Sequence, residues 1–233
     1  MKTIAIITAR GGSKRVPRKN VKELLGKPLL CYSVEAALAA GCFDEVMVST
    51  DDEEIAQIAR RAGASVPFFR SEETSGDFAT TSDVLREVLL RYEELGKQFE
   101  AACCLYPTAP FLTGERLRDA MQRLLDGNAD TVMSVVRFSF PPQRGMLLED
   151  GCLRLQYPEY RNARSQDLPP VYHDCGQFYC FRTEPFLKSG NIIGDTVLPY
   201  ILPETEVQDI DTQEDFELAE LKLRRLREKG GRD

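Results

Sequence analysis

The chain has a single histidine, His173, and no apolar run long enough to cross a bilayer. One histidine excludes histidine-rich metal centres, so any metal must be held by carboxylates, which suits Mg²⁺. The seven cysteines are odd in number and include no C-x-x-C pair. This pattern is typical of reduced thiols in a cytoplasmic protein and makes a nucleophilic cysteine the less favoured interpretation. No charged-then-apolar leader follows Met1, so we expect no signal peptide.

The chain also lacks a net positive charge. The 37 aspartates and glutamates outnumber the 30 lysines and arginines, which gives a formal net charge of −7. An acidic balance argues against general binding to nucleic acid or to a membrane surface, and we expect neither partner. A length of 233 residues fits one domain with a single core, residues 1–233.

Short apolar runs alternate with helical patterns along most of the chain. Thr3–Thr8 and Ala101–Tyr106 are typical of buried strands, whereas Thr81–Leu95 carries apolar residues at helical spacing. This βαβα order predicts an α/β fold with a mostly parallel sheet flanked by helices. The other expected strands are Glu45–Ser49, Ser65–Phe68, Thr131–Val136 and Cys175–Phe181, and the other expected helices are 28–41, Asp52–Ala62, 113–125 and Thr212–Glu228.

The alternation stops between about Phe138 and Tyr172. This segment holds five prolines and many charges, and it is too long for a bare loop inside a compact domain. We interpret 138–172 as an insertion, a β-arm that covers either the site or a partner subunit. We expect homodimerisation through this arm.

The stretch from Arg10 to Asn20 is the most informative part of the chain. It contains five cations and no acid, and it directly follows the first apolar run. Gly11 and Gly12 permit a tight turn in which successive N–H groups form a cradle for an anion. The stretch matches neither G-x-x-x-x-G-K-[ST] nor G-x-G-x-x-G. We therefore predict a phosphate loop of another α/β enzyme, with a solvated basic loop as the alternative.

Four further polar segments lie where the carboxyl ends of the strands are expected, the place where open α/β sheets bind ligands. In extended backbone, Asp209 and Asp211 point to one face and can anchor Mg²⁺ near a triphosphate. The alternative is that Asp211 or Thr212 caps the last helix, with Asp215 completing a capping box. The phosphate loop favours the metal interpretation. The four segments are Thr50-Asp51-Asp52, which is also a plausible helix cap, Arg70–Ser82, Pro107–Pro110 and Gln208–Asp211.

These motifs resemble those of the acylneuraminate cytidylyltransferases, the CMP-nonulosonic acid synthetases. The resemblance runs from Lys2 to about Leu221 and begins with a specific signature, Ala9–Lys14 followed by Pro17 and Lys19-Asn20. It implies a nucleotide-diphospho-sugar transferase-like, Rossmann-type fold. The later matching segments, in the family's order, are Ser49-Thr50-Asp51, Arg70, Ala79-Thr80-Thr81-Ser82-Asp83, Pro107-Thr108-Ala109-Pro110, Arg164-Ser165-Gln166-Asp167 and Asp209-Ile210-Asp211.

Within the family, the chain is most similar to the members that use pseudaminic acid. The supporting segments are 138–144, 164–168 and 172–179. In sialic acid members a glutamine precedes the Pro-Thr-Ser-Pro motif, whereas this chain has Tyr106 before Pro107–Pro110. The difference favours a differently substituted nine-carbon acid over sialic acid itself.

The resemblance implies that CTP and pseudaminic acid give CMP-pseudaminic acid and pyrophosphate, with Mg²⁺ on Asp209 and Asp211, for bacterial surface or flagellar glycosylation. It also implies a homodimer. The implied catalytic residues are Arg10, Lys14, Lys19 and Asp211. The implied nucleotide-binding residues are Arg10, Gly11, Gly12, Ser13, Asn20, Arg70, Thr80, Thr81 and Ser82. The implied sugar-binding residues are Tyr106, Gln143, Arg144, Arg164, Gln166 and His173, for which a strand-edge role of His173 is the alternative.

Three other functions stay open. Legionaminic or N-acetylneuraminic acid could replace pseudaminic acid as the substrate. A non-catalytic nucleotide-binding protein could share the fold, although it would not need Asp209 and Asp211. A sugar or nucleotide kinase is disfavoured by the missing P-loop, and release of pyrophosphate rather than a nucleoside diphosphate would exclude it.

Overall fold

A six-stranded sheet forms the centre of the molecule, in the order β10-β6-β9-β5-β1-β4. The computed structural model describes residues 1–230. β1 pairs in parallel with β4 and β5, and β10 pairs in parallel with β6, whereas β9 is antiparallel to β5 and β6. The mostly parallel sheet is therefore confirmed, with one reversed strand. The strands are β1 (Thr3–Thr8), β4 (Glu45–Ser49), β5 (Ala101–Leu105), β6 (Thr131–Arg137), β9 (Tyr172–Arg182) and β10 (Val197–Leu202).

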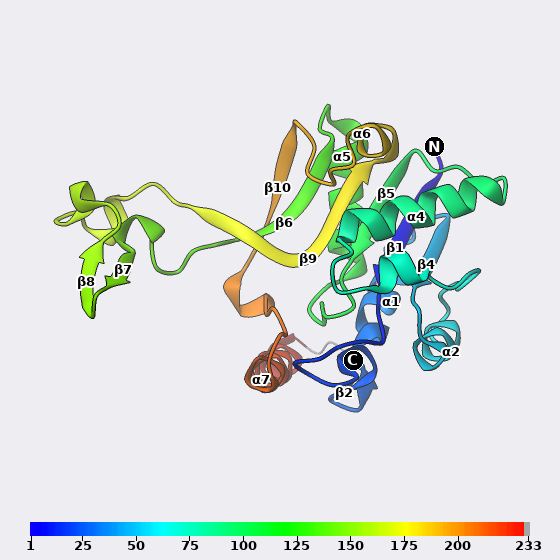
Figure 1. Ribbon diagram of the computed structural model, residues 1–233, viewed down its shortest axis with the longest axis horizontal. Coiled ribbons are helices and arrows are strands. Elements are labelled where there is room, and N and C mark those ends of the chain that lie inside the picture. The colour runs from blue at the N-terminus through cyan, green and yellow to red at the C-terminus, as the bar shows by residue number, and fades with distance from the viewer. Residues whose placement is uncertain (231–233) are drawn as a thin grey trace.

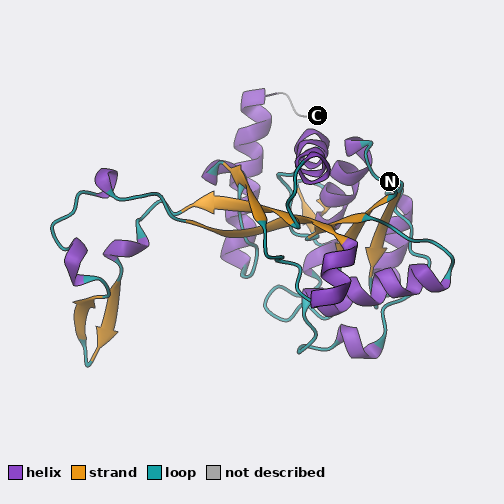
Figure 2. Cartoon of the chain, turned by 90° about the horizontal axis from the view of Figure 1, so that it is seen from above, coloured by secondary structure: helices purple, strands orange, loops and turns teal. Residues whose placement is uncertain are grey.

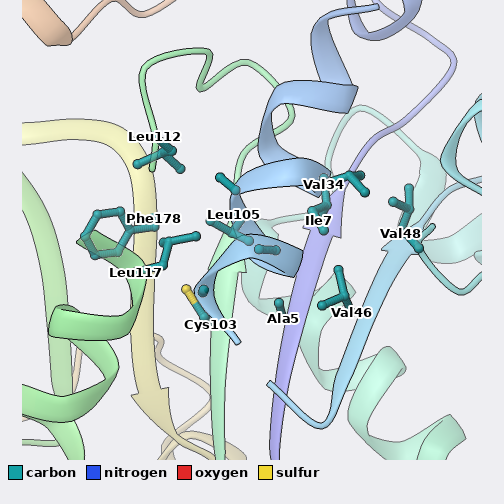
Figure 3. Close-up of a cluster of buried hydrophobic side chains, with 14 of the residues drawn as sticks. Ala5, Ile7, Val34, Val46, Val48, Cys103, Leu105, Leu112, Leu117 and Phe178 are labelled. Carbon is teal, nitrogen blue, oxygen red and sulfur yellow. The ribbon is translucent and has the colours of Figure 1, made fainter. Parts of the chain in front are cut away.

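Helices cover both faces of this sheet (Figure 1). Ile7, Val34 and Leu117 belong to the core on one face, where strand and helix side chains interlock (Figure 3). Because β1, β4 and β5 are buried on both faces, these strands appear in the sequence as continuous apolar runs. The helices on the first face are α1 (Leu29–Ala40), α2 (Glu53–Arg61) and α5 (Gly114–Asp126). Those on the second face are α4 (Thr81–Glu94) and α6 (Thr183–Ser189).

Local sequence signals set the ends of the helices. Thr80 and Asp83 form a capping box at the start of α4. Gly41 ends α1 in a left-handed conformation, φ 62°, which glycine adopts without strain. The expected strand at Ser65–Phe68 is wrong, because only Ser65 forms a bridge, to Met47. Pro67 has no N–H to extend a ladder at this place.

The insertion forms an arm that extends away from the sheet and its helices (Figure 1, Figure 2). β6 and β9 stay paired up to Arg137 and Tyr172, so the chain leaves and returns through one antiparallel pair. Farther out, β7 (Met146–Glu149) and β8 (Cys152–Leu155) form a hairpin. Large apolar side chains of this hairpin are exposed, namely Met146, Leu147, Leu148 and Leu153.

The last helix returns to the beginning of the chain. α7 (Gln213–Gly230) packs through Phe216 and Leu223 against α1 and a small hairpin of β2 (Glu23–Leu24) and β3 (Lys27–Pro28). This apolar contact brings the residues just before α7 to the loop after β1. A short helix, α3 (Glu72–Ser75), precedes α4. Within residues 1–230, no helix has the length and apolar character needed to cross a membrane.

Candidate active site

A cleft of about 300 Å³ opens beyond the carboxyl ends of β1 and β5. Its walls are the loop after β1, residues of the 70–84 segment, the loop after β5 and Asp211. This is the position at which open α/β sheets bind ligands. The sequence-predicted residues that line it are Arg10, Ser13, Lys14, Lys19, Asn20, Arg70, Thr80, Thr81, Tyr106 and Asp211.

Positive charge dominates one side of the cleft. Arg70 donates to Ser49 Oγ at 3.1 Å and to the Ser49 carbonyl at 2.7 Å, which holds its guanidinium in place. Burial lowers the pKa of Arg70, although the group stays charged at neutral pH. Arg10 and Lys14 extend from the loop after β1 and both pair with Asp77. Oriented arginine and lysine side chains are suited to phosphate groups.

The Gly11 amide is already hydrogen-bonded within the protein. It donates to Asp51 Oδ1 at 2.8 Å, so this N–H is not free for the predicted contact with phosphate. A Cβ on Gly11 would lie 2.7 Å from Asp52 Oδ2, whereas one on Gly12 would meet open space. Gly11 thus permits close packing on Asp52, which caps α2. Of the predicted nucleotide residues, Gly11, Gly12 and Ser82 do not line the cleft.

Asn20 lines the cleft and holds a buried acceptor without a partner among residues 1–230. The residue is only 4% exposed, and its Nδ2 donates to the Arg10 carbonyl at 2.9 Å. Its Oδ1 is buried and has no partner within the described residues. A buried acceptor without a donor is costly, so this atom suits an N–H or O–H of a ligand.

Asp211 does not cap α7. Thr212 and Asp215 form the capping box of α7, because each accepts a hydrogen bond from the backbone N–H of the other. Asp211 instead pairs with Arg15 at 2.9 Å and with Lys19 at 3.4 Å. The capping interpretation therefore holds for Thr212, and the Asp211 carboxylate faces the basic loop after β1.

Asp209 and Asp211 are the candidate ligands for a divalent cation; Asp211 lines the cleft and Asp209 lines a neighbouring cavity. Partial desolvation and the nearby charge of Asp211 raise the pKa of Asp209, which is the response expected of close carboxylates. Among residues 1–230, no three His, Cys, Asp or Glu side chains gather as a metal cluster. A metal on Asp209 and Asp211 would therefore complete its shell with substrate oxygens and water, as Mg²⁺ commonly does.

A second cavity of about 520 Å³ adjoins the cleft. Tyr106 lines both spaces. Its hydroxyl is 3.0 Å from Thr81 Oγ1, and its ring packs edge-on against Tyr179. His173 and Asp209 also line the second cavity. Tyr106 thus separates two compartments, one of them basic, which suits a reaction between two different substrates.

The other predicted sugar residues lie outside the cleft of their own chain. Gln143 donates to the Pro169 carbonyl at 3.1 Å, and Arg144 donates to Ser165 Oγ at 2.9 Å. Arg164 pairs with Asp167 at 2.7 Å. These contacts are all within the arm, and Gln166 lines a groove at its base. The four residues do not join Arg10 in one chain, because the arm extends away from the body (Figure 2).

Residues 4–142 match the family model described as Cytidylyltransferase, and they include the loop after β1, Arg70 and Tyr106. The chain belongs to the cytidylyltransferase family. The pseudaminic acid cytidylyltransferase of Campylobacter jejuni is 38% identical over 95% of this chain and 96% of its own length. The CMP-N,N'-diacetyllegionaminic acid synthase of Legionella pneumophila is 34% identical over 94% of this chain and 95% of its own. These relatives confirm the predicted family and enzyme class.

One solved structure has a fold similar to that of this cytidylyltransferase over nearly the whole chain. A CMP:2-keto-3-deoxy-manno-octonic acid synthetase complexed with CTP superposes with a TM-score of 0.69, covering 97% of this chain and 99% of its own. At 17% identity, this likeness concerns the fold alone.

Sequence reasoning did not single out several charged residues of this cytidylyltransferase. Arg15 pairs with Asp211, and Asp77 faces Arg10 and Lys14. Asp174 and Lys222 line the second cavity. Asp77 lies in the Arg70–Ser82 segment that the sequence places near the site. An acidic residue in that segment could therefore have been predicted to pair with the basic loop. Asp174 lies in the 172–179 segment that supports the family resemblance, whereas Lys222 carries no comparable local signal.

Proposed function

We propose that this cytidylyltransferase joins CTP to pseudaminic acid and releases pyrophosphate and CMP-pseudaminic acid. One observation carries the proposal: a basic cleft meets a second cavity at Tyr106, with Asp209 and Asp211 beside the junction. The printed activity of the Campylobacter relative supports the choice of sugar.

In the proposed reaction the anomeric hydroxyl of the sugar gives up its proton to solvent as its oxygen attacks the α-phosphorus in line. The bond to the bridging oxygen breaks, and pyrophosphate leaves with the electron pair. Negative charge grows on the α-phosphate and on the leaving group, where Arg10, Lys14 and Lys19 stabilise it. These cations belong to one loop, so they can stabilise the negative charge of the transition state without a large rearrangement.

The nucleoside binds on the other wall of the cleft. Arg70, Thr80 and Thr81 hold the cytidine and ribose, and Asn20 Oδ1 accepts a hydrogen bond from the nucleotide. Asn20 shares a loop with Lys14, so recognition of the nucleoside and of the phosphates is linked through the backbone.

Asp209 and Asp211 hold Mg²⁺ in this proposal. When bound, the ion polarises phosphate oxygens and neutralises their charge. Asp211 lies beside Lys19 of the phosphate loop, so the metal ligands and the phosphate-binding cations meet at one place. Burial and the charge of Asp211 raise the pKa of Asp209, and a bound cation would offset both effects.

The sugar occupies the second cavity, in contact with Tyr106 and His173. We propose that Gln143, Arg144, Arg164 and Gln166 serve the cavity of a second copy in a homodimer. The exposed apolar side chains of the arm, Leu148 and Leu153 among them, support its burial against a partner. The two arginines suit the sugar carboxylate.

A pyrophosphate-release assay tests the proposed function. CTP, UTP, ATP and GTP are each combined with pseudaminic, legionaminic and N-acetylneuraminic acid at fixed Mg²⁺. We expect the highest kcat/KM for CTP with pseudaminic acid. Release of a nucleoside diphosphate would instead indicate a kinase. Tight nucleotide binding without turnover would indicate a non-catalytic protein.

Legionaminic acid is the second candidate substrate, because a legionaminic acid synthase covers nearly the whole chain at 34% identity. Highest turnover with that acid would replace pseudaminic acid and keep the reaction. The proposal also includes a cytoplasmic location, supported by seven free cysteines, and a role in surface or flagellar glycosylation.

A further inference from the structure

Asp77 is the acid that faces the phosphate loop. Its Oδ1 lies 3.2 Å from Arg10 Nη1, and its Oδ2 lies 2.5 Å from Lys14 Nζ. All three residues line the cleft. The hydrogen bond and charge of Lys14 lower the pKa of Asp77, so the carboxylate is ionised at neutral pH. One acid therefore bridges two cations to which the proposed function assigns the phosphates of CTP.

The segment that carries Asp77 is anchored at its two ends. Before it, Glu87 of α4 accepts hydrogen bonds from the Ser71 N–H at 2.9 Å and from the Thr74 hydroxyl. After it, Thr80 is held by the capping box of α4. Between these anchors Asp77 is half-exposed and Phe78 fully exposed. Asp77 can therefore move away from the loop without breaking an apolar core contact.

Carboxylate and phosphate oxygens compete for the same donors, because arginine and lysine bind either group. CTP has an advantage in this competition, since its nucleoside also contacts Asn20 and Arg70 in the proposed site. Pyrophosphate has lost the nucleoside and keeps only the phosphate contacts. An acid beside Arg10 and Lys14 therefore opposes the retention of pyrophosphate.

We propose that Asp77 is a positioning residue that orients Arg10 and Lys14 between turnovers and competes with pyrophosphate for them, which speeds release of this product. The inference rests on the proposed function, because it requires that Arg10 and Lys14 bind phosphate. It adds a residue whose effect is on product affinity rather than on the chemical step.

The test is calorimetric titration of inorganic pyrophosphate into wild type and Asp77→Asn at fixed Mg²⁺ and low salt. Asparagine keeps the shape of the side chain and removes its charge. We expect the pyrophosphate Kd to fall about three- to tenfold, because two exposed ion pairs of modest strength are lost together. KM for CTP falls as well and kcat does not rise. Added salt reduces the difference in Kd, because it screens exposed charges.

Two further variants make the test specific. Glu73→Gln removes the same charge from the same segment at an exposed position that makes no ion pair with the phosphate loop. Its pyrophosphate Kd should change by less than about twofold. Asp77→Glu restores a carboxylate and should bring the Kd back toward the wild-type value.

An unchanged Kd in Asp77→Asn, or an equal shift in Glu73→Gln, would overturn the inference. Loss of turnover at unchanged pyrophosphate affinity would overturn it too, since Asp77 would then act in the chemical step. A wild-type protein that binds pyrophosphate but never converts CTP would refute the proposed function instead. The competition by Asp77 would still be measured directly in that protein.

Discussion

Lys19 Nζ lies 3.4 Å from Asp211 Oδ1, although 192 residues separate the two along the chain. Lys19 also donates to the Ile210 carbonyl, and Arg15 Nη2 is 2.9 Å from Asp211 Oδ2. Ion pairs thus connect the loop after β1 with the segment before α7. The active site that we propose depends on this junction.

Asp211→Asn should reduce CMP-sugar formation about a hundredfold or more, because the amide is a poor ligand for a hard cation that offsets charge in the transition state. The fold should persist, since Thr212 and Asp215 provide the cap of α7. Product formation is measured against Mg²⁺ concentration, with a melting curve for each protein.

Asp215→Asn is the matched control for Asp211→Asn. It alters the capping box and leaves the proposed metal ligand in place, so it should change the melting temperature more than the turnover. Near-normal activity of Asp211→Asn across the Mg²⁺ titration would place the metal site elsewhere.

Lys14→Ala should lower kcat about a hundredfold with a smaller effect on KM, because a cation positioned at developing charge acts mainly in the transition state. Steady-state kinetics with CTP measure both constants. Lys188→Ala removes an exposed lysine on α6 and should leave both constants unchanged. An effect of Lys14→Ala on KM alone would contradict the assigned role.

Gly11→Ala and Gly12→Ala should differ sharply. A Cβ at position 11 would be 2.7 Å from Asp52 Oδ2, while position 12 is open. We expect Gly11→Ala to lose about 1–3 kcal/mol of unfolding free energy, as for overpacked sites, together with most activity. Gly12→Ala should stay within about 0.5 kcal/mol of wild type. Urea unfolding and turnover measure both effects, and equal behaviour of the two variants would show that packing on Asp52 does not matter.

Asp52→Asn should destabilise the fold at neutral pH and not in acid. The hydrogen bond from Arg18 lowers the pKa of Asp52, so the pair stabilises the protein above about pH 4 and the effect is lost as the pH falls through the folded-state value. Because Arg18 is 41% exposed, water screens the pair and the loss should be at most about 1 kcal/mol. Asparagine keeps the cap of α2. Urea unfolding of both proteins at pH 7 and at successively lower pH checks this, and a difference that does not shrink as the pH falls would contradict it.

The arm predicts complementation between two inactive variants. Lys14→Ala damages the cleft and Arg164→Ala damages the arm. In a symmetric dimer whose arms serve the partner's cavity, the mixed dimer keeps one intact site, so coexpression should restore about a quarter of wild-type activity. Sedimentation measures the oligomeric state. A fully active monomer, or no gain on coexpression, would contradict the arrangement.

Local patterns along the chain were sufficient for much of the fold. The strand at Thr3–Thr8, the glycine stop at Gly41 and the capping box of Thr212 and Asp215 each depend on residues a few positions apart, so the sequence alone indicates them. Ser65–Phe68 shows the limit, because an apolar run became a single bridge beside Pro67. The small strands β2 and β3 and the edge strand β10 carry too little pattern to be predicted.

The sequence by itself indicated the class of the site: a strand, a glycine-rich basic loop and a pair of aspartates that we predict to bind a metal. Tertiary structure decided which groups meet. It pairs Asp77 with Lys14, 63 positions away in the chain. It makes β9 antiparallel to its neighbours, and it pairs Arg164 with Asp167 in the arm, away from the cleft of its own chain. Backbone propensity and side-chain alternation act over a few residues, whereas these pairings depend on how distant helices and strands pack on a common core.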